Sequence, residues 1–198
     1  TVQMAAASSR LGKKIITLEH VSKSYGGHTI FRDFSYGLLR SDRIGIVGRN
    51  GAGKSTLLRI IAGELAPDTG TVEMGETVRI GHFSQEGREL ELDQRVFDCI
   101  HGVAAQVRTE EGTFSAKTML ERFLFSPDLQ QTTIGRLSGG ERQALAVAKA
   151  VAWCESVLIM DEPTAALGAR QQALVYSTMR AAADKDLGVI VISHDIPK

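Results

Sequence analysis

The sequence predicts an α/β fold with a parallel core sheet, an N-terminal antiparallel β part and an α-helical subdomain. Short segments rich in β-branched residues alternate with longer segments whose apolar residues recur every three or four positions. This alternation is typical of buried strands and amphipathic helices in an α/β domain. From about 86 to 155 helical segments and charged loops dominate, which indicates the helical subdomain. Residues 1–13 form a linker-like tail, and 14–198 form the domain.

The expected elements follow one another along the chain, separated by turn residues such as Gly26 and Gly27. The strand-like segments are 14–21, 29–39, 43–48, 71–74, 78–83, 156–161 and 188–193. The helical segments are 57–65, 96–107, 115–125, 138–153 and 167–185. Ser138 is suited to cap the helix at 138–153. Pro163 ends the predicted strand at 156–161.

The composition is that of an ordinary globular protein, with 43% apolar and 23% charged residues. The 23 basic residues balance 23 acidic ones, which gives no strong signal for nucleic acid or an anionic membrane. Cys99 and Cys154 form no CxxC pair, so reduced thiols are expected rather than a disulfide or zinc site. The most apolar segment, 144–160, is interrupted by Lys149 and Glu155, so no transmembrane segment is expected. We therefore expect a cytoplasmic protein.

The segment GRNGAGKS (48–55) matches the phosphate-binding pattern G-x-x-x-x-G-K-[ST], between a predicted strand and a predicted helix. Glycines let the loop turn its N–H groups toward an anion, and the helix adds the positive end of its dipole. Lys54 is expected to reach the β- and γ-phosphates, and Ser55 offers a hydroxyl to magnesium. A chance match is expected in about one chain of this length in a hundred. The sequence thus predicts a P-loop NTPase whose nucleotide contacts Gly48, Asn50, Gly51, Ala52, Gly53, Lys54, Ser55 and Thr56.

Two predicted strands end in residues that are suited to hydrolysis. VLIMDE (157–162) ends in Asp161, which can support a magnesium shell, and Glu162, which can polarise a water molecule. Such a pair can also merely end a strand, but its conjunction with a phosphate loop favours catalysis. His194 follows the last strand and either holds the γ-phosphate and water or is an ordinary packed or solvated histidine. Gln85, after the strand at 78–83, can likewise be a simple loop residue.

Together, GRNGAGKST, VLIMDEP and LSGGE (137–141) resemble the ABC ATPase family, and the resemblance covers nearly the whole chain. It implies ATP hydrolysis as the activity, with ATP and Mg²⁺ as the cofactors. It also implies that Tyr25, in SKSYGG, stacks on adenine. Glu162 would be the general base and His194 the switch histidine, so the expected catalytic residues are Glu162, His194, Lys54 and Gln85. The expected magnesium ligands, direct or through water, are Ser55, Gln85 and Asp161.

The resemblance also explains LSGGE, which contains no obvious catalytic group. In this family two nucleotide-binding domains pair head to tail, and the signature motif of one contacts the γ-phosphate bound to the other. Ser138, Gly139 and Gly140 would therefore serve the ATP of a partner domain. A hydroxyl and free N–H groups at a helix N-terminus form an anion site, and Ser138 can cap its helix at the same time. The partner would be a second copy of this chain or the other half of a tandem protein.

Two parts of the chain resemble different branches of the family. Residues 13–142, with phrases such as VRIGHFSQE, resemble the second domain of ABC-F proteins, many of which act on ribosomes. Residues 143–198 resemble ATPase subunits of bacterial sugar importers, so a hybrid joined near Arg142 is one interpretation. ABC-F proteins have an aspartate where this chain has Gly168, in a loop that communicates between the two sites, so impaired activity is expected. The family continues past the position of His194, so a truncated C-terminal part is also expected.

Two classes of function remain open from the sequence. In the first, the chain is an ATP-hydrolysing domain whose dimer closes on ATP, reopens on hydrolysis and so does work on a partner. That partner would be the ribosome for an ABC-F protein, or a membrane transporter subunit that docks on the helical subdomain at 86–136. In the second, the chain is an ATP-binding module with little or no hydrolysis, which Gly168 favours. Phosphate release above that of a Lys54→Ala variant distinguishes the two classes.

Overall fold

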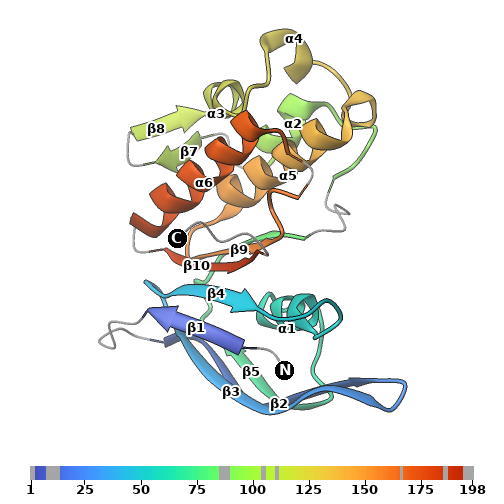
Figure 1. Ribbon diagram of the computed structural model, residues 1–198. Coiled ribbons are helices and arrows are strands. Elements are labelled where there is room, and N and C mark those ends of the chain that lie inside the picture. The colour runs from blue at the N-terminus through green and yellow to red at the C-terminus, as the bar shows by residue number, and fades with distance from the viewer. Residues whose placement is uncertain are drawn as a thin grey trace.

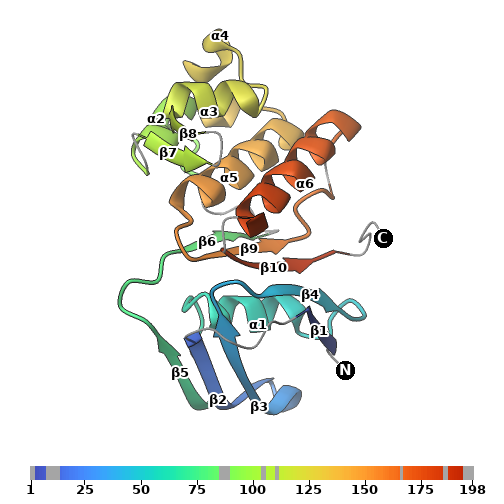
Figure 2. The same cartoon turned by 90° about the vertical axis from the view of Figure 1, so that its left-hand side faces the viewer.

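The computed structural model describes residues 3–7, 14–84, 90–103, 106–109, 112–165, 167–184 and 187–193. The described strands form a five-stranded sheet, a three-stranded sheet and a two-stranded hairpin. The five-stranded sheet lies in the middle of the molecule, as Figures 1 and 2 show, with helix α1 and the three-stranded sheet on one side and the longer helices on the other. This arrangement confirms the predicted α/β architecture.

The central sheet has the strand order β1-β4-β10-β9-β6, and its last four strands run parallel. These parallel strands are β4 (Arg43–Val47), β10 (Gly188–Ile192), β9 (Val157–Asp161) and β6 (Ile80–Phe83). The predicted parallel core sheet is thus confirmed. Strand β1 (Gln3–Ala7) pairs antiparallel with β4, within the tail that the sequence predicts to be linker-like. The sequence did not predict this strand, and the boundary between tail and domain stays a prediction.

Strand β9 is buried along its whole length, because both faces of the sheet are covered. Val157 and Ile159 point into the core that α1 shares with the three-stranded sheet. Leu158 and Met160 point into the second core, under the helices on the opposite face. Alternating side chains point to opposite faces of a strand, so a strand between two cores must be apolar at every position. This explains the continuous apolar run in the sequence.

The three-stranded sheet is antiparallel, with the order β3-β2-β5, and confirms the predicted antiparallel part. Its strands are β2 (Lys14–Tyr25), β3 (His28–Leu39) and β5 (Thr69–Met74). Helix α1 (Lys54–Ile61) lies between this sheet and the central sheet (Figure 2). Leu57, Leu58, Ile60 and Ile61 are nearly inaccessible to solvent there. Burial of each such side chain stabilises the fold by about 1.5–3 kcal/mol.

The helices on the other face form the second core. They are α2 (Val96–His101), α3 (Ala116–Arg122), α4 (Pro127–Gln130), the 3₁₀ helix η1 (Ile134–Arg136), α5 (Gly139–Trp153) and α6 (Ala169–Asp184). Helix α5 packs closest to the sheet, with Leu145 and Ala148 fully buried. Among the described helices, none is both long and apolar enough to cross a lipid bilayer.

One predicted helix is wrong. The sequence analysis expects a helix over 96–107, but α2 ends at His101, and Gln106–Thr109 form strand β7. This strand pairs antiparallel with β8 (Gly112–Ser115). Gly102 ends the helix, and the β-branched residues of QVRT and GTFS favour a hairpin over a further helical turn. The spacing of apolar residues continues past Gly102, so this spacing alone does not distinguish the hairpin from a longer helix.

Strand β6 and helix α5 lie in direct contact at Gly81. A Cβ atom added to Gly81 would collide with the carbonyl oxygen of Ala150 and with the side chain of Cys154. The helix backbone therefore lies directly on the strand, and only glycine fits between them. Burial raises the pKa of the Cys154 thiol to about 11, and Cys99 and Cys154 are both free thiols, as expected.

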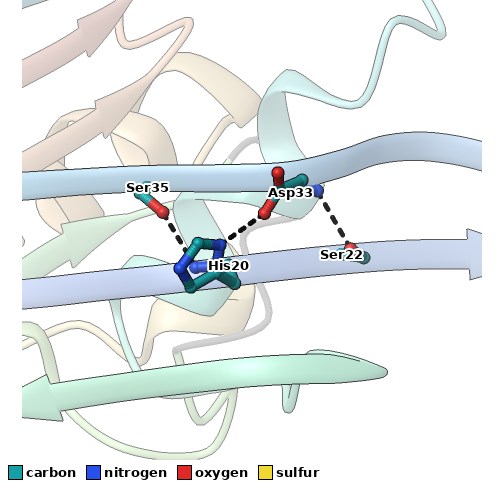
Figure 3. A network of polar contacts seen from close by, with 4 residues as sticks. All are labelled: His20, Ser22, Asp33 and Ser35. Carbon is teal, nitrogen blue, oxygen red and sulfur yellow. Dashed lines mark hydrogen bonds and ion pairs between the residues drawn. The ribbon is translucent and has the colours of Figure 1, made fainter.

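The paired strands β2 and β3 of the three-stranded sheet carry an exposed polar network (Figure 3). His20 and Asp33 both have left-handed backbone conformations, with φ of 52° and 54°, at irregularities in the pairing of the two strands. Their side chains point toward each other, with Nδ1 of His20 2.6 Å from Oδ1 of Asp33. The amide of His20 donates to Ser35 Oγ, and the amide of Asp33 donates to Ser22 Oγ. The network thus satisfies backbone groups that the irregular pairing leaves unpaired.

We predict that Gly81→Ala destabilises the domain by about 1–3 kcal/mol, because the added methyl group forces α5 away from β6. Urea denaturation measures this change in the free energy of unfolding. Gly168→Ala is the control, since a Cβ atom at Gly168 meets no atom within 4 Å. Equal stability of the two variants would contradict the close approach of helix and strand.

We predict that the carboxylate of Asp33 raises the pKa of His20 above the ordinary value of 6.5, mainly through their hydrogen bond. The contribution of this pair to stability is therefore complete below that ordinary value and is lost as the pH rises through the folded-state pKa. NMR titration of the His20 ring should show a lower pKa in Asp33→Asn than in the unmodified chain. An unchanged pKa in the variant would refute the pairing.

Candidate functional site

The phosphate loop joins the end of β4 to the first turn of α1. Gly51 and Gly53 have left-handed φ angles of 77° and 90°, which residues with a side chain rarely adopt. Gly53 is the N-cap of α1, and a Cβ atom there would also collide with the side chain of Ile30. The sequence therefore needs glycine at this position for two reasons, the backbone angle and the neighbour. Ala52 N donates to the carbonyl of Arg49 at 3.1 Å, which closes the turn.

Lys54 is the first residue of α1 and is only 8% exposed, although it carries a charge. Its Nζ donates to the carbonyl oxygens of Gly48, at 2.8 Å, and Arg49, at 3.2 Å. Both acceptors are neutral, so they hydrogen-bond the ammonium group without neutralising it. A buried cation inside a ring of backbone groups at a helix N-terminus favours a bound anion.

The two acidic residues at the end of β9 have different backbone conformations. Asp161 is the last residue of the strand and is 4% exposed. Glu162 follows with a left-handed φ of 52°, a conformation that costs a non-glycine residue about 1–3 kcal/mol. Its amide donates to the carbonyl of Ile192, at the end of β10, at 3.0 Å. The parallel pairing of β9 and β10 therefore holds Glu162 in a strained but defined position.

A cavity of about 470 Å³ brings most of the predicted site residues together. This volume lies within the range of small-molecule sites. Phosphate-loop residues line one part of it, Tyr25 and Ile30 another, and the ends of β9 and β10 a third. The lining residues are Tyr25, Ile30, Asn50, Gly51, Ala52, Gly53, Lys54, Ser55, Thr56, Asp161, Glu162, Ala165 and Ile192. The sequence analysis did not find Ile30, Ala165 or Ile192, because side chains of these types carry no chemical signal.

The lining fits a nucleoside triphosphate with magnesium. Left-handed glycines, a buried lysine and the start of α1 suit a chain of phosphates. Ser55 and Asp161 offer a hydroxyl and a carboxylate in the same cavity, and hard oxygen donors are those that Mg²⁺ prefers. Magnesium bound there would neutralise charge on the phosphates. The part played by each residue stays a prediction.

Tyr25 lies at the end of β2, and its side chain is about half exposed in the mouth of the cavity. Lys23 Nζ lies 5.6 Å from the centroid of its ring. Asp68 accepts from Lys23 Nζ at 2.6 Å and from the amide of Ser24 at 2.7 Å. These two bonds hold the pKa of Asp68 below its usual value, the Lys23 bond having the larger effect. The sequence analysis missed this network, because Lys23 and Asp68 are far apart along the chain.

The signature segment, LSGGE (137–141), leads into α5 with a complete capping box. This confirms Ser138 as the N-cap. Ser138 Oγ accepts from the amide of Glu141 at 3.3 Å, and the Glu141 carboxylate accepts from the amide and hydroxyl of Ser138. The two bonds from Ser138 lower the pKa of Glu141. Gly139 and Gly140 form the first turn of the helix. None of these residues is among the described residues that line the cavity.

Two predicted site residues, Gln85 and His194, lie outside the described part of the chain. Gly168 is exposed just before α6, and its carbonyl accepts from the amide of Gln172 at 2.9 Å. Gln143, in the second turn of α5, was not singled out from the sequence. Its side-chain amide donates to the carbonyl of Pro163 at 3.0 Å, next to Glu162.

Comparison with known families agrees with this geometry. Residues 31–165, more than half of the chain, match the model of the ABC transporter family. The chain belongs to this family, and it is a nucleotide-binding domain of the ABC ATPase type. The resemblance seen in the sequence motifs is thereby confirmed.

Curated relatives extend the match over almost the whole chain. The chain is 39% identical over 197 residues to the uncharacterized ABC transporter ATP-binding protein YfmR of Bacillus subtilis (strain 168), covering 98% of this chain and 31% of that protein. It is 34% identical over 190 residues to the energy-dependent translational throttle protein EttA of Escherichia coli (strain K12), covering 94% of this chain and 33% of that protein. The chain therefore spans about a third of the length of these relatives. Both alignments are long enough to pass Arg142, and the predicted division of the chain into two branches stays a prediction.

A solved structure shows the same fold. It is the dimeric post-hydrolysis state of an ATP-binding cassette bound to ADP and Pi, with a TM-score of 0.71 and 21% sequence identity. The match covers 91% of this chain and 88% of that one. At this level of identity the comparison supports the fold alone.

We predict that Tyr25→Ala weakens ATP binding by about 1–3 kcal/mol, because base stacking on an aromatic ring contributes about that much. The affinity for inorganic tripolyphosphate should not change, because it has no base. Tyr25→Phe is the matched control and should bind ATP normally. Isothermal titration calorimetry measures these affinities, and an equal loss for ATP and tripolyphosphate would contradict the stacking role.

Proposed function

We propose that the chain binds ATP with Mg²⁺ and hydrolyses it, in a dimer of two ABC domains arranged head to tail. One observation carries the proposal: a single cavity gathers the phosphate loop, Tyr25, Asp161 and Glu162, while the signature segment at Ser138 lies outside it. One chain thus offers two separate half-sites, and two copies would complete each other.

In the proposed reaction the chain's residues position the phosphates and a water molecule. The N–H groups of the phosphate loop and Lys54 would hold the β- and γ-phosphates, and Asp161 with Ser55 would hold the magnesium. Glu162, which follows β9 and lines the cavity, accepts a proton from the water that attacks the γ-phosphorus, and the bond from that phosphorus to the bridging oxygen of ADP breaks. ADP and phosphate then leave as the two chains separate.

The proposed dimer is supported by the chemistry at the start of α5. Ser138 Oγ and the free amides of the first turn of α5 would contact a γ-phosphate bound to the partner. These contacts exist only when the two chains close, so ATP binding stabilises the closed form. The solved structure with the same fold is itself dimeric, with ADP and Pi bound.

We propose translation as the setting in which this ATPase works, in the manner of an ABC-F protein in the cytoplasm. The relative EttA is named a translational throttle, and 94% of this chain aligns with it. Binding to ribosomes should then weaken with added salt, because phosphate contacts dominate such affinity. A sugar-importer subunit is the second candidate, favoured by the resemblance of residues 143–198, and it would need a membrane partner instead.

The proposal predicts that Glu162→Gln dimerises when Mg-ATP is added, because this variant keeps the nucleotide and loses the general base. Light scattering should show a shift from the chain mass of 21.4 kDa to about twice that value. The double variant Lys54→Ala, Glu162→Gln should stay at one chain mass, since it lacks the phosphate-binding ammonium.

A Glu162→Gln chain that binds ATP by calorimetry but stays monomeric would overturn the paired site for this chain. Phosphate release by the unmodified chain at the level of Lys54→Ala would instead favour the binding module without hydrolysis. Light scattering therefore tests the proposed dimer, and phosphate release tests the proposed hydrolysis independently.

A further inference from the structure

Glu162 has a backbone conformation that a non-glycine residue does not favour, so contacts with neighbouring residues must stabilise it. Its φ of 52° is left-handed, and the residue that follows is Pro163, which donates no backbone hydrogen bond. The amide of Glu162 donates to Ile192, in β10. The carbonyl of Glu162 accepts from the amide of Ala165 at 3.3 Å, within the same turn. These contacts come from the sheet and from the turn itself.

A third contact comes from helix α5, which begins with the signature motif LSGGE. The side-chain amide of Gln143 donates to the carbonyl of Pro163 at 3.0 Å and to the carbonyl of Glu162 at 3.4 Å. Gln143 lies five residues after Ser138, in the second turn of α5. A single half-buried side chain therefore connects the helix that begins with the signature segment to the backbone of the proposed general base.

We propose that Gln143 is a positioning residue that couples the two ATP sites of the dimer. The start of α5 serves the nucleotide of the partner, while Glu162 serves the nucleotide of its own chain. When Ser138 docks on the partner's γ-phosphate, α5 is fixed, and Gln143 fixes the carbonyls of Glu162 and Pro163 with it. Hydrolysis in one site thus depends on nucleotide in the other. This inference rests on the proposed function.

The capping box makes this connection rigid. Ser138 and Glu141 bond to each other through three contacts of 2.7 to 3.3 Å, so the first turn of α5 cannot open without losing them. Behind it, Ala144 and Leu145 are buried against the core, which prevents the helix from rotating freely. A displacement of the signature segment is therefore passed to Gln143 as a displacement of the whole helix.

A purely structural role for Gln143 has a matched control in the chain. Gln130, in α4, also donates from its side-chain amide to two backbone carbonyls, those of Phe125 at 3.0 Å and Lys117 at 3.4 Å. Gln130 is more deeply buried than Gln143 and lies in the helical part, outside the cavity lining. Gln130→Met should therefore disturb folding at least as much as Gln143→Met, without changing the coupling of the sites.

The test compares Gln143→Met, Gln143→Glu and Gln130→Met with the unmodified chain. Both Gln143 variants should lower kcat about tenfold or more and leave the affinity for ATP within about twofold, because the general base is displaced while the phosphate loop is intact. The Hill coefficient for ATP hydrolysis should fall from above 1 in the unmodified chain toward 1. Gln143→Glu should be the more severe, since its carboxylate faces two carbonyl oxygens. Gln130→Met should keep the kcat and the Hill coefficient of the unmodified chain.

Hydrogen exchange supplies a readout that does not depend on activity. The amides of Glu162 and Ala165 should exchange faster in Gln143→Met than in the unmodified chain or in Gln130→Met, because the turn loses one of its supports. An unmodified chain without turnover would overturn the proposed function, and hydrogen exchange would then decide alone whether Gln143 holds Glu162. Normal exchange, or an active Gln143→Met with an unchanged Hill coefficient, would overturn the coupling.

Discussion

The burial of strand β9 on both of its faces is the constraint on which the other parts of the structure depend. Its side chains alternate between the core around α1 and the core under α5, so the strand joins the two halves of the molecule. Parallel strands β10 and β6 pair along its two edges. Because β9 cannot move without disrupting both cores, the carboxylates of Asp161 and Glu162 at its end are held in place. The site is therefore positioned by apolar residues that touch no ligand.

Left-handed backbone conformations occur on two sides of the cavity. Glu162 and Gly53 both have left-handed backbone conformations beside the same cavity, and Gly53 also lies against Ile30. Glycine adopts this conformation without steric cost, whereas Glu162 needs support from its surroundings, because a left-handed φ costs a non-glycine residue about 1–3 kcal/mol. The well-packed strands on both sides supply the difference. A polar site of defined shape thus exists because the surrounding apolar core is large and stiff.

The sequence predicted those features that depend on neighbours along the chain. The phosphate loop, the Ser138 cap and the buried strands are local patterns, and the structure contains each of them. Features that depend on distant partners were missed or predicted wrongly. Strand β1 is defined by its pairing with β4, and β7 by its pairing with β8, whereas a local apolar spacing indicated a helix there. The bond between Lys23 and Asp68 joins residues 45 positions apart, which no local pattern shows.

In the proposed dimer, the segment LSGGERQ (137–143) would serve folding and two sites at once. Ser138 and Glu141 form hydrogen bonds with each other and begin α5, which satisfies amide groups that the first turn of a helix leaves unpaired. The two glycines leave the first turn uncovered, so a phosphate can approach its amides. Gln143 faces away from that end, toward the carbonyls after β9. Ser138 caps the start of α5, and Gln143 lies in its second turn, farther along the helix axis. In the proposed dimer, Ser138 could therefore contact the partner while Gln143 contacts the backbone next to Glu162. The absence of a catalytic side chain in LSGGERQ is therefore consistent with its proposed role, which is to position groups of the two sites.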